Sequence, residues 1–306
     1  MLDVLTLRSP VIAAPLCGIS DYPYRQLNRE LGIGLTYSEM ISSVGISRGN
    51  LKSLSFTFVR GEHPVVVQLF GNDPAQMAYA AQVFENEGAD AIDINLGCSV
   101  KKVIKQGAGS ALQRNLPQTK AVILAIRKAI KIPLFIKCRL GWSRQEENYL
   151  ELASMAQDEG VNALCLHPRY ATQLFSGEAN WDHFHALRKK YSFPLIGSGD
   201  IKTSQDITQA LRQYPINAVM LGRGLVGNPW LLSDFLDSTR PTAIEILRHH
   251  ADLLLQYYPE HKACSLLRKY VAKYTKGFPN ALALRLFGNT LSRAGDIAVL
   301  LEMMHV

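Results

Sequence analysis

Two stretches in the second half of the chain indicate its fold most clearly: Leu195–Asp200, which reads LIGSGD, and Ala218–Gly224, which reads AVMLGRG. In each, a short apolar run typical of a buried strand is followed at once by glycines. Because glycine has no Cβ, backbone amides in such turns can approach an anion closely. Two consecutive strands that end this way predict a phosphate site at the carboxyl end of an α/β domain.

On both sides of these turns, short runs rich in Val, Ile and Leu recur along the chain, separated by amphipathic stretches of helical length. This rhythm is typical of parallel strands joined by helices. The predicted strands are Val11–Ala14, Leu35–Glu39, Val65–Leu69, Ala91–Asn95, Leu134–Arg139, Ala163–His167, Leu195–Ser198 and Ala218–Leu221. The predicted helices include Pro74–Glu87, Gln118–Lys131, Glu146–Glu159, Asp182–Lys190 and Ser204–Arg212.

Eight alternating units predict an α/β fold, a closed (β/α)8 TIM barrel. The length of 306 residues agrees, because such barrels run to about 250 residues as one unit. After Leu236 the strand rhythm stops and the chain reads as helices. We therefore expect a barrel at residues 1–239 and a small all-helical domain at residues 240–306. An open doubly wound sheet ranks second, because no G-x-G-x-x-G follows the first strand.

The composition of the chain indicates the cellular location of the protein and the kind of partner that it binds. With 47% hydrophobic and 19% charged residues, the chain can build a large core. Its start lacks the layout of a signal peptide and no apolar run nears the roughly 20 residues of a membrane span, so we expect a cytoplasmic protein. The net charge of +7 comes mostly from the range between Arg240 and Arg293, which contains nine Lys and Arg residues and only three acidic residues. This suits a polyanionic partner, although a solvated basic surface is commoner.

The cysteines point away from disulfides and metals. They are odd in number, scattered and never spaced C-x-x-C, so we expect free thiols and no metal site. We expect Cys138 to face the helices and Cys165 to fill the barrel interior. The five are Cys17, Cys98, Cys138, Cys165 and Cys264.

Polar residues gather where the predicted strands end, which is where barrel enzymes carry their chemistry. Lys137 and Arg139 share one face of a strand, and a buried face with two cations demands acceptors. We expect Arg139 to pair with Asp93 inside the barrel. That pair leaves Lys137 and other polar side chains without a role, and their convergence predicts a ligand site. The other side chains are Gln68, Asn95 and His167.

The glycine turns predict that the ligand carries a phosphate. Arg223 can add a charge-assisted contact, and we expect the following helix to add its N-terminal dipole. Two ligands fit the residues. A sugar phosphate with Lys137 as a Schiff-base amine would make an aldolase, whereas a flavin mononucleotide would use Lys137 and Gln68 as donors. Composition and spacing do not separate them.

A loop motif is more specific. Asp93–Val103 (DINLGCSVKKV), followed by Gly107–Leu112 (GAGSAL), closely resembles the signature of tRNA-dihydrouridine synthases. The likeness runs from about Val11 to Trp230 and is most similar to the bacterial B-type subgroup. Further segments fall in that family's order and spacing: Ala14-Pro15-Leu16 with Asp21, Ile136–Trp142, His167-Pro168-Arg169, Gly199-Asp200-Ile201 and Gly222-Arg223-Gly224.

The resemblance implies an FMN-containing barrel and a helical tRNA-binding domain, which together reduce the C5–C6 double bond of uridine with NADPH. It implies that Cys98 gives a proton to C5 while flavin N5 gives a hydride to C6. It places Pro15, Leu16, Cys17, Gln68, Lys137, His167, Ser198, Gly199, Asp200, Gly222 and Arg223 around FMN. It places Asn95, Lys101, Lys102, Arg139, Lys269 and Lys273 near the RNA. No protein partner is implied, and we expect a monomer.

Three residues depart from the family pattern. Ser99 stands where proline is usual, Leu16 where methionine is usual and Ser198 where asparagine is usual. Two other functions therefore stay open: a flavin-dependent barrel that acts on a free pyrimidine or other small molecule, and a catalytically silent tRNA-binding protein.

The basic helix expected at His261–Lys276 is a candidate for contacts with the RNA. Lys269, Lys273 and Lys276 follow helical spacing, which suits phosphate contacts. Tyr270 and Tyr274 either accompany them at the surface or belong to the core.

Overall fold

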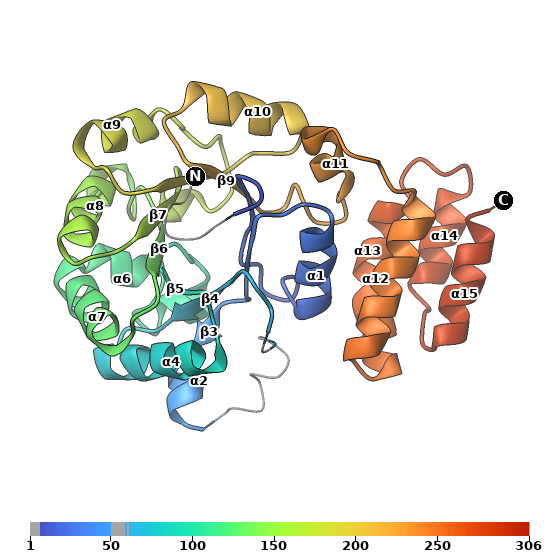
Figure 1. Ribbon diagram of the computed structural model, residues 1–306, viewed down its shortest axis with the longest axis horizontal. Helices are drawn as coiled ribbons and strands as arrows, with labels where there is room; N and C mark the ends of the chain where they lie inside the picture. Colours follow the sequence, from blue (N-terminus) through green and yellow to red (C-terminus); the bar gives the residue numbers. More distant parts are fainter. Residues whose placement is uncertain (1–6, 50–58, 60, 306) are drawn as a thin grey trace.

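The computed structural model, which describes residues 7–49, 59 and 61–305, is a closed barrel of parallel strands with a group of helices beside it (Figure 1). The strands pair in the order β2-β1-β9-β8-β7-β6-β5-β4, and β2 also pairs with β4, which closes the ring. The barrel strands are β1 (Val11–Ala13), β2 (Leu35–Tyr37), β4 (Val65–Phe70), β5 (Ala91–Asn95), β6 (Leu134–Arg139), β7 (Ala163–His167), β8 (Leu195–Ser198) and β9 (Ala218–Leu221). A short strand, β3 (Ile41–Ser42), pairs with β4.

Helices follow the strands around the outside of the barrel (Figure 1). They are α1 (Tyr22–Glu30), α2 (Ser43–Ser47), α4 (Pro74–Glu87), α5 (Lys101–Ile104), α6 (Ser110–Arg114), α7 (Leu116–Ala129), α8 (Tyr149–Asp158), α9 (His183–Lys190), α10 (Ser204–Gln213) and α11 (Trp230–Leu236), with 3-10 turns η2 (Arg144–Glu146) and η3 (Ala171–Gln173). The predicted TIM barrel is confirmed, and each predicted strand ends within two residues of the observed one. In the described ranges, no helix has both the length and the apolar character needed to cross a bilayer.

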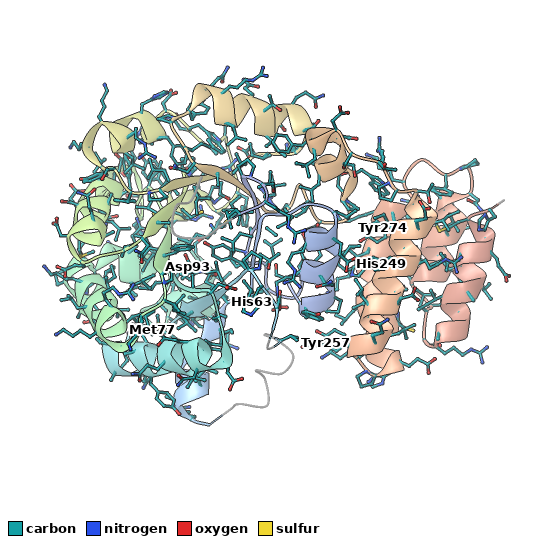
Figure 2. The ribbon with its side chains drawn as sticks, in the orientation of Figure 1. His63, Met77, Asp93, His249, Tyr257 and Tyr274 are labelled. Carbon is teal, nitrogen blue, oxygen red and sulfur yellow. The ribbon has the colours of Figure 1, made fainter. Side chains whose placement is uncertain are left out.

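Local signals set the ends of these elements, as α4 illustrates. The Asp73 side chain accepts a hydrogen bond from the N–H of Gln76 at 2.8 Å, and Pro74 occupies the first turn. Gly88 ends the helix with φ 97°, a conformation that favours glycine. Met77 on the inner face of α4 is fully buried (Figure 2). The helix is therefore fixed by its caps and by its apolar face.

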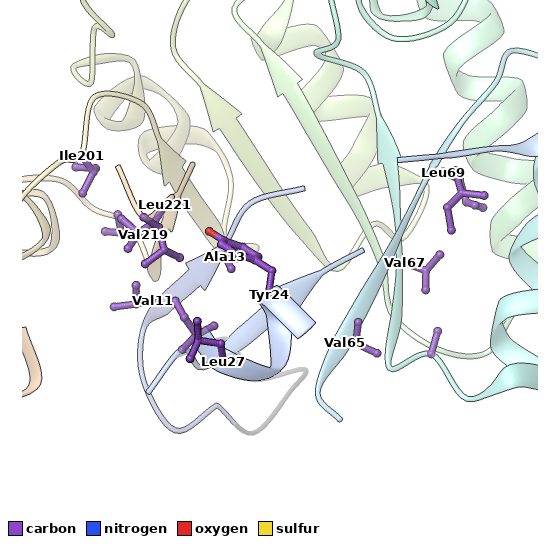
Figure 3. Close-up of a cluster of buried hydrophobic side chains, with 14 of the residues drawn as sticks. Val11, Ala13, Tyr24, Leu27, Val65, Val67, Leu69, Ile201, Val219 and Leu221 are labelled. Carbon is purple, nitrogen blue, oxygen red and sulfur yellow. The ribbon is translucent and has the colours of Figure 1, made fainter. Parts of the chain in front are cut away.

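Side chains alternate along each strand between the barrel interior and the surrounding helices. Outward residues such as Val11 and Leu221 join Leu27 of α1 in the larger buried cluster, part of which Figure 3 shows. Inward residues form a separate cluster around the barrel axis. Cys138 belongs to the outer cluster and Cys165 to the inner one, so both thiols lie on the predicted sides.

Four helices follow α11 and lie beside the barrel in Figure 1: α12 (Ala243–Tyr257), α13 (Glu260–Tyr274), α14 (Ala281–Gly288) and α15 (Ala294–Met303). Figure 2 shows His249, Tyr257 and Tyr274 on the side that faces the barrel. His249 forms an ion pair with Glu30 of α1, and Tyr270 stacks on Tyr24 with ring centroids 6.2 Å apart. Tyr270 and Tyr274 are each only 2% exposed, so both are core residues.

His250 on α12 lies at the centre of this aromatic group. Its side chain is fully buried, its ring centroid is 4.5 Å from that of Tyr270, and its Nδ1 is 2.9 Å from the Tyr274 hydroxyl. Burial lowers the pKa of His250 to about 3, helped by the charges of His249 and Lys269. The folded protein therefore keeps this ring neutral at pH values where the unfolded chain, with a histidine pKa of about 6.5, takes up a proton.

Replacing His250 should change how stability depends on pH. Between about pH 4 and 6 the unfolded state binds one more proton at this residue, so the free energy of unfolding falls as the pH falls. We expect His250→Gln to remove about 1.4 kcal/mol per pH unit from that dependence. Urea unfolding of both proteins at several pH values measures the difference. Parallel curves would contradict a neutral buried ring.

Candidate functional site

A cavity of about 930 Å³ opens at the carboxyl ends of the barrel strands. Its size lies within the range of small-molecule sites, about 300–1,000 Å³. It brings together fourteen of the predicted site residues from six strands and their loops. These are Pro15, Leu16, Cys17, Asn95, Cys98, Lys101, Lys137, Arg139, His167, Ser198, Gly199, Asp200, Gly222 and Arg223.

Four predicted site residues lie outside this lining. Gln68 is fully buried in the barrel interior, and Lys102 is exposed on α5. The Lys269 ammonium donates a hydrogen bond to the carbonyl oxygen of Gly18, just after Cys17. The side chain of Lys273 lies against Gly227, where a Cβ would be 2.4 Å from Lys273 Cδ. The two helical lysines therefore contact barrel loops that continue from the cavity wall.

The turns after β8 and β9 pack against each other. At Gly224 a Cβ would lie 2.2 Å from the carbonyl oxygen of Ile201, so a side chain there would force the turns apart. Gly199 has φ 135°, and a Cβ there would lie 3.1 Å from His167 Cδ2. Within the part of the chain that is described, the N–H groups of Gly199, Asp200, Arg223 and Gly224 donate to no protein acceptor. The paired turns thus leave a group of amides available to an anion.

Two details of these turns correct the sequence prediction. Gly197 does not serve the phosphate turn: a Cβ there would lie 2.2 Å from Trp181 Cζ3, so this glycine makes room for the indole ring. The helix expected directly after the second turn, α11, begins only at Trp230. A turn closed by a 3.1 Å hydrogen bond from Leu225 N to the Gly222 oxygen stands in its place. At this end of the cavity, backbone amides rather than a helix dipole are therefore available to an anion.

Positive charge dominates the cavity wall. Asp200, the acidic residue in the described lining, forms an ion pair with Arg169 at 2.7 Å. Among the described residues, Lys137 is half-buried and its ammonium has no hydrogen bond or ion pair. An unpaired ammonium beside free amides fits an anionic or strongly accepting ligand. The cationic lining residues are Lys101, Lys137, Arg139, Arg169, Lys202 and Arg223.

The expected pair between Arg139 and Asp93 does not form. Arg139 donates to the carbonyl oxygens of Gly97 (2.9 Å), Tyr170 (3.0 Å) and Leu174 (2.9 Å). Strand register explains the difference: Arg139 pairs with His167 at the cavity, whereas Asp93 pairs with Phe135, four residues earlier on β6. That separation is about 13 Å along the strand. Alternation placed both side chains inside the barrel, but it did not give their depth.

Arg169 organises the site, a role that the sequence did not reveal although the residue stands in a family motif. It is 2% exposed and donates to His167 Nε2 at 3.0 Å and to both Asp200 carboxylate oxygens at 2.7 and 2.8 Å. Since a guanidinium only donates, Nε2 of His167 accepts and the ring proton lies on Nδ1. Burial and the neighbouring cations lower the pKa of His167 to about 2, so the ring is neutral.

The second partner of Arg169 is held charged. Burial alone would raise the pKa of Asp200, but hydrogen bonds from Arg169 and from the N–H of Ala179 bring it below its ordinary value. The Asp200 carboxylate is therefore occupied by protein donors. Only its backbone N–H remains for a ligand, and its φ of 59° belongs to the turn conformation.

The loop after β5 fixes the backbone of Cys98 on the cavity wall. Asn95 Oδ1 accepts from the N–H of Cys98 at 2.9 Å, and the Cys98 carbonyl accepts from the N–H and the hydroxyl of Ser110, each at 2.9 Å. At Gly109, with φ 62°, a Cβ would lie 2.5 Å from the Cys98 oxygen. The loop is therefore held on both sides of Cys98, although Ser99 replaces the usual proline.

Two exposed apolar residues at the cavity were not predicted. Leu174 and Phe175 are 52% and 57% exposed, and the Arg223 guanidinium lies 4.3 Å from the Phe175 ring centroid. An exposed ring beside guanidinium groups offers a surface for stacking a planar ring system. The two residues lie in the loop after η3, where no periodicity marks a buried or functional face.

Comparison with known proteins points to one family. The family model described as dihydrouridine synthase matches residues 11–303. A probable tRNA-dihydrouridine synthase from Rhizobium leguminosarum bv. phaseoli is 36% identical over 282 residues, 91% of this chain and 89% of that protein. The tRNA-dihydrouridine synthase B of Pasteurella multocida is 33% identical over 308 residues, 97% of this chain and 92% of that protein.

A solved structure adds evidence on the fold alone. Histamine dehydrogenase from Rhizobium sp. 4-9 has a TM-score of 0.58 with 13% sequence identity, over 83% of this chain and 50% of that chain. The family match, in contrast, includes the Cys98 loop, both glycine turns and the helices that follow the barrel. This chain belongs to the dihydrouridine synthase family.

Proposed function

We propose that this protein is a tRNA-dihydrouridine synthase, which uses FMN and NADPH to reduce the C5–C6 double bond of uridines in tRNA. The observation that carries the proposal is that Cys98 and the two glycine turns line one cavity. Reducing this double bond requires a hydride and a proton, and the cavity offers an anchor for a cofactor phosphate and a thiol. Relatives that cover most of the chain carry the same name.

The residues present fit FMN. The free N–H groups of Gly199, Asp200, Arg223 and Gly224 would hold its phosphate, together with the Arg223 guanidinium. The Lys137 ammonium and the Nδ1–H of His167 would donate to polar atoms of the cofactor, while Pro15, Leu16, Cys17 and Ser198 would complete the lining. Bound there and reduced by NADPH, FMN supplies the hydride for C6 of uracil.

In this proposal Cys98 supplies the proton. A thiol S–H can donate a proton, and here the Cys98 backbone is fixed by Asn95 and Ser110. The S–H bond breaks as the C5–H bond forms, and the thiolate takes its next proton from water. Asn95, Lys101 and Arg139 line the same wall and would contact the incoming nucleotide.

Basic groups around the cavity would hold the RNA. A uridine must leave its stack to enter the barrel, so the protein must grip folded tRNA by shape and charge. Lys101 and Lys102 are exposed on α5, beside the Cys98 loop. Lys269 and Lys273 are exposed on α13 and meet the barrel at Gly18 and Gly227, next to the cavity loops. Phosphates of a tRNA placed over the cavity would contact both groups.

Purified protein should be yellow with bound FMN and should form dihydrouridine in unmodified tRNA when NADPH is added. Binding of tRNA should weaken steeply as salt rises, because phosphate contacts release counterions. A protein that takes up no FMN would contradict the proposal. Turnover of free pyrimidines without RNA would favour the small-molecule flavoenzyme, and tRNA binding without product would favour the silent binding protein.

A further inference from the structure

Three polar side chains link the interior of the barrel to the Cys98 loop by hydrogen bonds. Asp93 and Asn95 point inward from β5, and Gln68 is the register partner of Asp93 on β4. Gln68 Nε2 donates to Asp93 Oδ2 at 2.8 Å, and Asn95 Nδ2 donates to Gln68 Oε1 at 2.8 Å. Asn95 Oδ1 then accepts the N–H of Cys98 at 2.9 Å. An uninterrupted chain thus runs from Asp93 to the backbone of Cys98.

The carboxylate at its start gives this chain a direction. In its ionised form Asp93 only accepts hydrogen bonds, so Gln68 then turns its NH2 group toward Asp93 and its oxygen toward Asn95. Asn95 must then turn its NH2 group toward Gln68 and its oxygen toward the N–H of Cys98. Without an acceptor at position 93, Gln68 is free to flip, and only the N–H groups of Gly97 and Cys98 then hold the direction of Asn95. A flipped Asn95 would set two donors against each other at the Cys98 backbone.

Packing alone does not explain an acidic residue here. Asp93 is fully buried (Figure 2), and its Oδ1 has no hydrogen-bond partner among the described residues. Burial raises the pKa of Asp93 to about 7, against the lowering effects of Gln68 and Lys137. The other titratable groups that face it are Tyr37 on β2 and Cys165 on β7. In this largely apolar interior an apolar side chain would avoid the cost of burying a carboxylate.

We propose that Asp93 is a positioning residue for Cys98, because through Gln68 and Asn95 it orients the amide that holds the Cys98 backbone. The inference rests on the proposed function, in which Cys98 is the proton donor. Asp93 itself touches neither cofactor nor substrate, since it lies outside the cavity lining. Its effect should therefore reach proton transfer without reaching cofactor binding or reduction by NADPH.

Hydrogen–deuterium exchange of the full-length protein with FMN bound tests the link directly. Asp93→Leu removes the acceptor at similar size, whereas Asp93→Asn keeps an oxygen that no longer forces the direction. Tyr37→Phe is the matched control, because it removes a buried hydroxyl without a described partner from the same region. Exchange in the peptide that carries Gly97 and Cys98 should be about tenfold faster in Asp93→Leu, less accelerated in Asp93→Asn and unchanged in Tyr37→Phe.

Rapid mixing then separates the two half-reactions. In Asp93→Leu, NADPH should reduce the flavin at the wild-type rate, whereas reoxidation by unmodified tRNA should be about tenfold slower. Equal slowing of both steps would contradict the inference and assign Asp93 to the cofactor. Wild-type exchange together with wild-type reoxidation would also overturn it.

The exchange measurement also tests the role of Asp93 if the Asp93 variants do not fold or if the wild type forms no product. If neither Asp93 variant folds, Gln68→Met interrupts the chain at its middle and should accelerate the same exchange; unchanged exchange would overturn the inference. If the wild type forms no dihydrouridine, only the proposed function fails, because the exchange measurement requires no substrate.

Discussion

The Cys98→Ala variant should retain FMN and oxidise NADPH like the wild type, yet form dihydrouridine at least about a hundredfold more slowly. The change removes only the group proposed to protonate C5, and general acid catalysis typically contributes 10²–10⁴-fold. The thiol lines the cavity, but its backbone is held by Asn95 and Ser110, so losing the sulfur should leave the loop in place. Flavin absorbance, NADPH consumption and nucleoside analysis of the tRNA measure the three properties.

Two variants control this result. Cys98→Ser keeps the size but supplies a far weaker acid, so it should fall close to Cys98→Ala. Cys264→Ala removes a buried thiol from α13, away from the cavity lining, and should keep full activity. Product formed by Cys98→Ala at the wild-type rate would show that another group protonates C5.

The second large effect is expected from Gly224→Ala, which should lose both stability and FMN. Its Cβ would lie 2.2 Å from the carbonyl oxygen of Ile201, and a backbone atom cannot rotate out of the way. Overpacking of this kind costs about 1–3 kcal/mol, which lowers the melting temperature by roughly 5 °C. Moving the turns apart also separates the N–H groups proposed to hold the phosphate. Thermal unfolding and the FMN content of the purified variant report the two losses.

Other glycines provide matched controls. At Gly295, in the first turn of α15, no other part of the protein lies within 4 Å of an added Cβ, so Gly295→Ala should lower neither property. At Gly222 the nearest atom is Ala14 Cβ at 3.9 Å, so Gly222→Ala should keep the wild-type melting temperature. A Gly224→Ala protein with normal stability and full FMN content would contradict the proposed phosphate site.

Much of the barrel could be predicted because its signals are local. Each strand is a short apolar run, and alternation along a strand decides which side chains point inward. Cys138 and Cys165 illustrate this, since each lies on its predicted side. The division into residues 1–239 and 240–306 stays a prediction.

Partners at a distance could not be read from the sequence. Alternation along the strands predicted that Asp93 and Arg139 point into the barrel. It did not predict the strand register, which places the two side chains at different depths. Gly197 and Gly199 look alike in the sequence, yet one makes room for Trp181 and the other lies against His167. Arg169 donates hydrogen bonds to His167 at the end of β7, to Gly177 in the following loop and to Asp200 in the turn after β8. Its role therefore depends on tertiary structure.

Dihydrouridine mapping in cellular tRNA shows whether this protein makes dihydrouridine and whether it needs Cys98 to do so. Cells that lack this protein should lose dihydrouridine at particular positions, the wild-type chain should restore it, and Cys98→Ala should not. Unchanged dihydrouridine at every position in the deleted cells would contradict the proposed function, and full restoration by Cys98→Ala would contradict the proposed role of Cys98.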